Sequence, residues 1–136
     1  AQEELKQNGT DAFFTINHMR VVLRETDHAI AELTVMPDSC NPYGRVHGGA
    51  FYTLGDTASG TAVHTDGRLY VTQESSFHFL RNVTVGHTVR AEAVIRHRGH
   101  TTCLSEVTFT DETGQLLALG EYTFFASIGN NDRMLM

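Results

Sequence analysis

With 136 residues, 40% of them hydrophobic, the chain is long enough for one domain with a substantial core, which argues against a disordered protein. Its formal net charge of -6 argues against a nucleic-acid partner, because nucleic-acid binders usually carry a basic surplus. No apolar run approaches the ~20 residues of a membrane helix, and the polar N-terminus does not resemble a secretory signal, so we expect a cytoplasmic protein without a membrane partner.

The first predicted elements form a hairpin. Residues 1–18 are a polar segment with room for a short helix. Two strands follow, at 19–26 and 29–36, with a tight turn at Asp27 and His28 between them. The second strand alternates apolar and polar residues, as a strand with one buried face does.

A long loop and one long helix come next. Residues 37–46 hold both prolines and a glycine, which predicts a loop that can carry function. Between residues 47 and 65, apolar side chains recur at helical spacing. Small residues occupy the middle of the predicted buried side, so the helix can lie close to a sheet: Gly55, Ala58, Gly60 and Ala62.

The remaining sequence alternates with a period of two residues and predicts four more strands. They fall at 70–80, 89–95, 103–109 and 116–127. Short turns at Gly99 and Gly114 join the last three, which favours a mostly antiparallel sheet. The predicted fold class is α+β, with about six strands curled around one long helix. One chain of this size has no second layer to cover the sheet, so we expect a homo-oligomer.

The cations are arginines, with Lys6 as the one exception among ten. Arginine grips phosphate with a planar fork of donors, so a local cluster indicates a small phosphorylated ligand. The cluster consists of Arg81, Arg90, Arg96 and Arg98. The alternative is a solvated strand face on which the arginines are scattered.

Residue types that bind metals do not form a metal-binding pattern. The two cysteines lack CxxC spacing. His97 and His100 are three residues apart, but in a stretch that predicts a turn. We therefore expect neither a metal nor a cofactor.

A glycine pair, Gly48 and Gly49, stands at the predicted start of the long helix. The first N–H groups of a helix lack partners within the helix, and the helix dipole adds partial positive charge there. Such a site can hold an anion or a developing oxyanion. The alternative is a glycine-assisted turn from loop into helix, which is common.

Asp56 is the second unusual feature of this helix. Its neighbours are small or apolar residues, and aspartate has a poor propensity for a helix interior. A buried carboxylate is costly unless it is paired or hydrogen-bonded. The alternative is an exposed position on the outer face of the helix.

The run NPYGRVHGGAFYTLGDTASG resembles the signature of hotdog-fold acyl-CoA thioesterases of the phenylacetate-degradation (PaaI-like) type. Members of this family show an asparagine, then HGG, then an acidic residue nine positions after the histidine; here these are Asn41, His47 with the two glycines, and Asp56. The second half resembles the family in its turns at Gly99 and at 111–114. The resemblance covers about residues 19–128, the expected thioesterase domain, and leaves a polar tail at 129–136.

The resemblance implies a role for each residue of the signature. The Gly48 amide would polarise the thioester carbonyl as oxyanion donor, and Asp56 would be the nucleophile or the general base. Asn41 would order the loop or the attacking water. We expect His47 to brace the loop, with a catalytic acid role as the alternative. On the strand after the helix, the serine or threonine that the family places near the acid aligns best with Thr72, ahead of Gln73 and Ser75.

The resemblance also implies a site for the CoA end of the substrate. Gly49 and Arg81 would contribute to substrate binding. The family often carries a lysine or arginine after the glycine of a hairpin turn, and here that position is His100. The grip on phosphate would then shift to Arg96 or Arg98, which we expect to share one strand face because they are two residues apart. We expect His100, close to both arginines, to contribute to the same phosphate site.

The spacing on the helix predicts an oligomeric site. Gly48 and Asp56 are eight residues apart, hence ~12 Å apart along the axis, so both cannot contact one thioester carbon within one chain. Two antiparallel helices across a two-fold axis would bring Gly48 of one subunit to Asp56 of the other. We expect a homodimer or homotetramer with composite sites, as the resemblance also implies.

The predicted function is hydrolysis of an acyl-CoA thioester to a free acid and CoA. The alternative is a non-catalytic acyl-CoA-binding hotdog module, although such modules typically lack the acid that Asp56 supplies. A hotdog dehydratase or hydratase ranks last, because those enzymes show a catalytic histidine and a different spacing.

Overall fold

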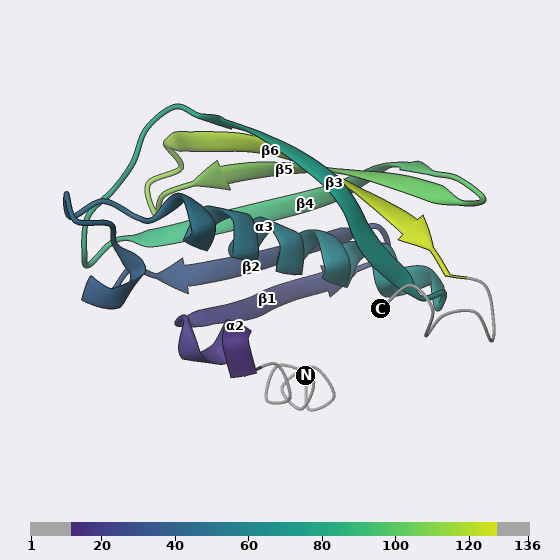
Figure 1. Ribbon diagram of the computed structural model, residues 1–136, viewed down its shortest axis with the longest axis horizontal. Helices are drawn as coiled ribbons and strands as arrows, with labels where there is room; N and C mark the ends of the chain where they lie inside the picture. Colours follow the sequence, from purple (N-terminus) through teal and green to yellow (C-terminus); the bar gives the residue numbers. More distant parts are fainter. Residues whose placement is uncertain (1–11, 128–136) are drawn as a thin grey trace.

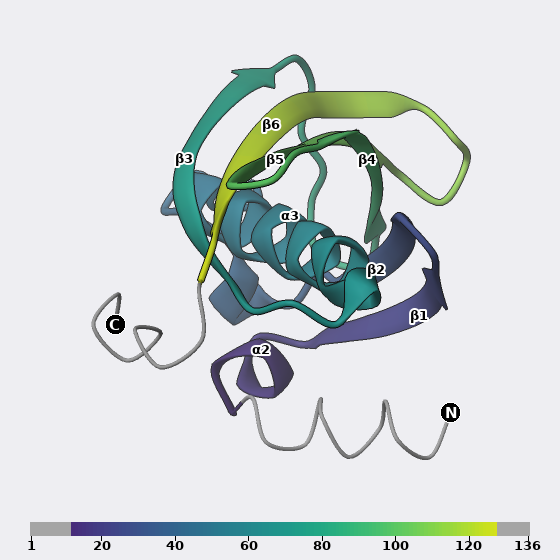
Figure 2. The same cartoon turned by 90° about the vertical axis from the view of Figure 1, so that its right-hand side faces the viewer.

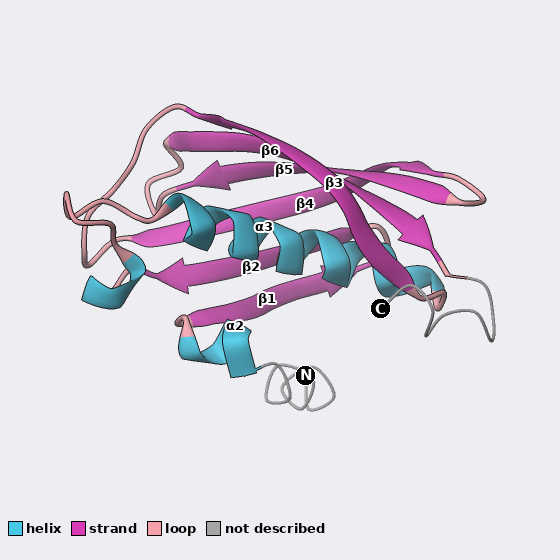
Figure 3. Ribbon diagram, viewed as in Figure 1, coloured by secondary structure: helices cyan, strands magenta, loops and turns pink. Residues whose placement is uncertain are grey.

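Six strands form one antiparallel sheet that curls around a single long helix in the computed structural model, which describes residues 12–127 (Figures 1 and 3). The elements in chain order are α2 (Ala12–Ile16), β1 (Met19–Glu25), β2 (His28–Thr34), η1 (Pro37–Ser39), α3 (Gly48–Val63), η2 (His64–Asp66), β3 (Tyr70–Phe79), β4 (Thr88–Arg98), β5 (Thr102–Thr110) and β6 (Leu116–Ala126). The strand order is β1-β2-β4-β5-β6-β3, so β1 and β3 are the two edges. The predicted α+β arrangement is confirmed.

Figure 2, a view along the helix, shows the concave side of the sheet facing α3. Buried apolar side chains from both elements form the core between them. The apolar residues that α3 buries recur every three or four positions at Phe51, Leu54, Ala58 and Ala62, and Val63 is buried at its end. The central strands face them with short side chains, which let the helix lie close: Ala29 and Ala31 of β2, and Ala91 and Ala93 of β4.

The predicted short helix of the N-terminal segment corresponds to α2, beside β1 (Figures 1 and 2). Its Phe14 is buried, which attaches the segment to the core. Residues 1–11 and the predicted tail at 129–136 lie outside the described residues. Within residues 12–127, none of the helices is long and apolar enough to span a bilayer.

At Gly55, α3 lies close against the side chains of the sheet. A Cβ built on it would lie 2.5 Å from the Tyr122 hydroxyl and 2.7 Å from Cζ of Phe109. Real Cβ atoms essentially never show such distances, and both neighbours belong to aromatic side chains that are themselves buried. Glycine is therefore required here by space, since its backbone conformation is that of an ordinary helix.

Gly55→Ala is expected to lower the free energy of unfolding by ~1–3 kcal/mol, because overpacking forces the neighbouring rings and backbone to shift. Gly60→Ala is the matched control on the same helix, since nothing lies within 4 Å of a Cβ built there. That control should be neutral or stabilising by up to ~1 kcal/mol, because glycine is a poor helix former. Urea unfolding of both variants measures the difference, and equal stabilities would contradict the close approach.

Candidate functional site

Asn41 closes the loop that leads into α3. Its side-chain Oδ1 accepts hydrogen bonds from the backbone amides of Tyr43 at 2.9 Å and Arg45 at 3.1 Å. The Asn41 amide in turn donates to the Arg45 carbonyl at 2.7 Å. An asparagine that binds its own backbone in this way builds a turn. The geometry is that of a residue that orders the loop, one of the two roles expected for it.

His47 caps the N-terminus of α3. Its Nδ1 accepts a hydrogen bond from the Gly49 amide at 3.0 Å, and its carbonyl accepts one from the Ala50 amide at 2.9 Å. The Gly49 amide is thereby occupied. The Gly48 amide, by contrast, meets no acceptor within residues 12–127. Of the two glycines, Gly48 is the one whose N–H is available to a ligand at the positive end of the helix.

Asp56 lies two turns farther along α3, where it meets β3. The Thr72 hydroxyl donates to its Oδ1 at 2.7 Å. Burial raises the pKa of Asp56 above its ordinary value, and the hydrogen bond from Thr72 acts in the opposite direction. No lysine or arginine among residues 12–127 contributes to this shift. A half-buried carboxylate without a counter-charge is typical of a group kept for chemistry.

Thr72 is the residue of β3 that reaches Asp56, as the alignment with the family predicts. The register between β3 and β6 shifts between Thr72 and Glu74, which leaves Gln73 as the extra residue of a bulge. Ser75 pairs with Tyr122 farther along β6. The bulge therefore separates Thr72 from the other two occupants considered for this position.

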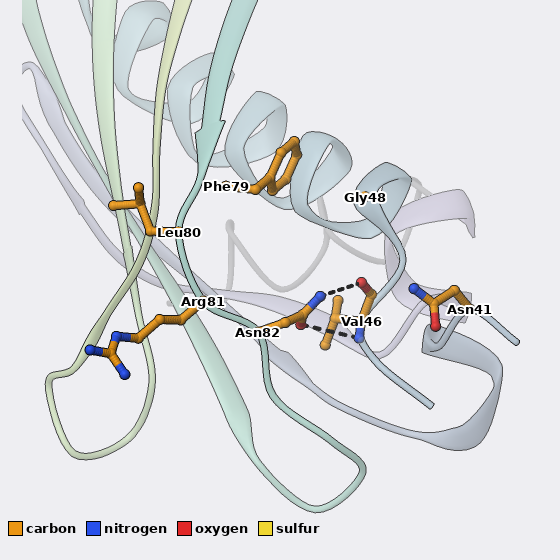
Figure 4. Close-up of a pocket in the computed structure, with 7 residues that line it drawn as sticks. All are labelled: Asn41, Val46, Gly48, Phe79, Leu80, Arg81 and Asn82. Atoms are coloured by element: carbon orange, nitrogen blue, oxygen red, sulfur yellow. Dashed lines mark hydrogen bonds between the residues drawn. The ribbon is translucent and has the colours of Figure 1, made fainter. Parts of the chain in front are cut away.

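An open pocket of about 390 Å³ lies at the N-terminus of α3 (Figure 4). Its lining comes from the loop before α3 and from the chain at the end of β3: Asn41, Val46, Gly48, Phe79, Leu80, Arg81 and Asn82. Arg81 is exposed, and it forms no ion pair within residues 12–127. The pocket thus joins the free Gly48 amide to a cation that is available for a ligand.

Asn82 is a site residue that the sequence did not reveal. Its Oδ1 accepts from the Val46 amide at 3.2 Å, and its Nδ2 donates to the Val46 carbonyl at 3.0 Å, as the dashed lines in Figure 4 show. The side chain therefore fixes both polar groups of a residue two positions before Gly48. The contact joins residues 36 positions apart, so no local sequence pattern predicts it.

The other predicted phosphate ligands do not form a joint site. The register of β4 against β5 shifts between Ile95 and His97, which makes Arg96 the extra residue of a bulge. A bulge reverses the alternation of side chains beyond it. The prediction that Arg96 and Arg98 share one face is therefore wrong.

Each of these arginines is held by carboxylates. The guanidinium of Arg96 donates to Glu106 at 2.7 Å. Arg98 turns toward the end of α3, where it donates to Asp27 at 2.6 Å and to Asp66 at 2.7 Å. His100 is exposed in the β4–β5 turn, and its carbonyl accepts from Arg68. The contacts of Arg98 join the end of β4 to the β1–β2 turn and to the residues that follow α3. The contact of Arg68 joins those residues to the β4–β5 turn.

Comparisons with known proteins identify the family and the fold of this chain. Residues 43–118 match the model of the family described as the thioesterase superfamily. The acyl-coenzyme A thioesterase PaaI of Escherichia coli (strain K12) is 27% identical over 73% of this chain and 71% of its own. The solved structure of E. coli PaaI has a TM-score of 0.88, with 24% identity over 94% of this chain and 93% of that one, which confirms the predicted hotdog fold.

Two streptococcal structures contain relevant ligands. A hypothetical thioesterase from Streptococcus pneumoniae TIGR4, solved with coenzyme A, is 28% identical, with a TM-score of 0.83 over 90% of this chain and 96% of that one. The protein smu.793 from Streptococcus mutans UA159, bound to acetyl CoA, is 33% identical, with a TM-score of 0.77 over 80% and 88%. Variants of the S. pneumoniae protein carry alanine for an aspartate at position 52 or a threonine at position 68. That separation of 16 equals the one between Asp56 and Thr72.

Proposed function

Because the chain belongs to the thioesterase superfamily, we propose that it hydrolyses an acyl-CoA thioester to a free acid and CoA. The observation that supports this most strongly is the half-buried Asp56, which is hydrogen-bonded by Thr72 and has no counter-charge among the described residues. A module that only binds acyl-CoA has no use for such a carboxylate, since its burial costs free energy.

In this proposal each residue of the site acts at a definite atom. The Gly48 amide hydrogen-bonds the thioester oxygen, where negative charge develops as the carbonyl is attacked. Asp56 either attacks the carbonyl carbon itself, which expels the CoA thiolate and leaves an acyl–aspartyl anhydride that water hydrolyses, or it takes a proton from the attacking water and passes it to the thiolate as the C–S bond breaks. Thr72 holds the carboxylate, while Asn41 and His47 hold the loop and the helix start. The products are the acid and the CoA thiol.

We place each active site between two subunits. Gly48 and Asp56 lie on one straight helix, eight residues and ~12 Å apart, so one chain cannot bring both to one carbonyl. An antiparallel α3 from a second copy removes this separation. The edge strand β3 supports such pairing, because its outer side has no partner strand within residues 12–127. A homodimer, or a homotetramer of two dimers, then carries two sites per dimer.

A screen of acyl-CoA thioesters with a thiol-detecting reagent tests the proposal. We expect continuous release of CoA thiol, matched by an equal amount of free acid. Calorimetry with the same compounds supplies the comparison with the alternative function. Tight binding of an acyl-CoA without release of thiol would identify a binding module and overturn the hydrolase.

Thr72→Val is expected to move the acid limb of the pH profile of kcat/KM to higher pH. The ionised Asp56 is the active form, and the Thr72 hydrogen bond lowers the pKa that burial raises. Without that bond the carboxylate takes up its proton at a higher pH, so activity falls earlier as the pH drops. Thr61→Val is the control, since the Thr61 hydroxyl donates to the Thr57 carbonyl on the same helix and does not contact Asp56. Identical profiles for both variants would contradict a role for Thr72.

Arg81→Gln is expected to raise KM for acyl-CoA and leave kcat nearly unchanged, the mark of lost uniform binding. The anionic nucleotide end of CoA needs a cation near the pocket, and Arg81 is exposed there and has no ion-pair partner among residues 12–127. Arg96→Gln is the control, because that guanidinium is held by Glu106. An acyl-pantetheine, which lacks the nucleotide, should not distinguish Arg81→Gln from wild type. An equal rise in KM for that substrate would place Arg81 elsewhere along the ligand.

A further inference from the structure

Tyr122 of β6 brings a hydroxyl group into the backbone of α3 beside Asp56. The side chain is 0% exposed, and its hydroxyl donates to the carbonyl of Tyr52 at 2.6 Å. In an α-helix that carbonyl accepts the amide of the residue four positions on, which is Asp56. A side chain from the sheet thus binds the helical turn that ends at the candidate catalytic residue.

The fit between Tyr122 and the helix depends on Gly55. A Cβ on Gly55 would lie 2.5 Å from the hydroxyl oxygen and 2.9 Å from Cε1 of the same ring. Neighbouring rings hold the phenol from its other sides, with centroid distances of 5.4 Å to Tyr52 and 5.5 Å to Phe77. The packing therefore directs the hydroxyl toward the Tyr52 carbonyl.

The surroundings of the Tyr122 hydroxyl keep it protonated, so that it acts as a hydrogen-bond donor. Burial first, and the charge of Asp56 next, raise the pKa of Tyr122 far above its ordinary value. The group stays protonated at all working pH values, so it is a permanent donor and no base. Because it is fully buried, it does not touch substrate within the protomer.

We propose that Tyr122 is a positioning residue for Asp56: by holding the Tyr52 carbonyl it fixes the turn of α3 at which Asp56 meets Thr72. The inference rests on the proposed function of Asp56. A carboxylate that must reach one carbonyl carbon gains rate from being held in place, and a misplacement of about 1 Å can cost as much as 10²-fold. Loss of the hydroxyl should therefore act on kcat and leave KM unchanged.

Tyr122→Phe, which removes only the hydroxyl, is compared with Ser105→Ala. Ser105 of β5 is also 0% exposed, and its hydroxyl also crosses from the sheet to α3, where it donates to Ser59 at 2.8 Å. We expect kcat of Tyr122→Phe to fall about tenfold with KM within about twofold. Ser105→Ala should lower Tm to a similar extent but keep kcat within about twofold of wild type. Wild-type kcat in Tyr122→Phe, or equal losses of kcat in both variants, would overturn the proposal.

The same change in an Asp56→Asn background shows whether Tyr122 acts through Asp56. We expect the residual rate of Asp56→Asn, measured in single turnovers, to stay the same when Tyr122→Phe is added, because effects on one chemical unit are not additive. A further loss by the factor seen in the single variant would mean that Tyr122 acts independently, against the proposal. Wild-type turnover in Asp56→Asn alone would instead refute the proposed function itself.

Discussion

Asp56→Asn is expected to lower kcat by at least ~10²-fold while the fold persists, since it keeps the shape of the side chain and removes the base or nucleophile. The amide oxygen can still accept the hydrogen bond from Thr72. In the described part of the chain no cation loses a partner, because none there contributes to the shifted pKa of Asp56. The loss is therefore one of chemistry and not of structure.

The stability of this variant provides an independent check. Burial raises the pKa of Asp56, so ionisation at neutral pH costs the folded state free energy that the neutral asparagine avoids. Tm of Asp56→Asn should equal or exceed that of wild type. Asp38→Asn, at an exposed aspartate beside His18, is the control and should keep wild-type kcat. Turnover near the wild-type value in Asp56→Asn would rule out Asp56 as the catalytic base or nucleophile.

The elements of the fold follow from patterns that are local in the sequence. Alternation and helical spacing predict the six strands and the helix because a buried face repeats every two or 3.6 residues. The turn at Asp27 is also local, with φ of 60° in the left-handed region that aspartate tolerates better than most residues. The signature residues could be found because they stand on one loop and one helix.

The contacts that complete the site join distant parts of the chain. Asn82 reaches Val46 across 36 positions, and Tyr122 reaches Tyr52 across 70. The local sequence predicts neither contact, because an asparagine after a strand and a tyrosine within a strand are both common. The sequence shows small residues along α3, but only the packed sheet reveals that Gly55 has no room for a methyl group.

The bulge at Arg96 explains why Arg96 and Arg98 do not share a strand face, contrary to the prediction from the sequence. Strict alternation places Arg96 and Arg98 on one face, but the extra residue turns Arg98 inward. There it donates to the Val63 carbonyl at the end of α3, at 3.1 Å, as well as to two carboxylates. A cation at the C-terminus of a helix is stabilised by the helix dipole. The carbonyl that binds this cation belongs to the end of α3, which lies 35 positions before Arg98 in the sequence.

Gly48→Pro is expected to lower kcat by ~10²–10³-fold, the usual cost of one lost oxyanion donor. Proline is tolerated at the first position of a helix, where its missing N–H would have no partner. His47 already has φ of -63° and ψ of 138°, which suits a residue before proline. The nearest atom to a Cβ at Gly48 is Cζ of Phe79, at 3.9 Å. Gly48→Ala, which adds bulk but keeps the amide, should lose much less activity.

Mixing the two inactive variants, Gly48→Pro and Asp56→Asn, is expected to restore activity if each site is shared between subunits. In an equal mixture after exchange, about half of the dimers are hybrids, and each hybrid has one site with both groups intact. Turnover should then reach about a quarter of the wild-type value, from parents that are each nearly inactive. Native mass spectrometry measures the hybrid fraction, and the recovered rate should rise in proportion to it. Hybrids without recovered activity would show that Gly48 and Asp56 do not meet across the interface, and the ~12 Å between them would then exclude a shared role at one carbonyl.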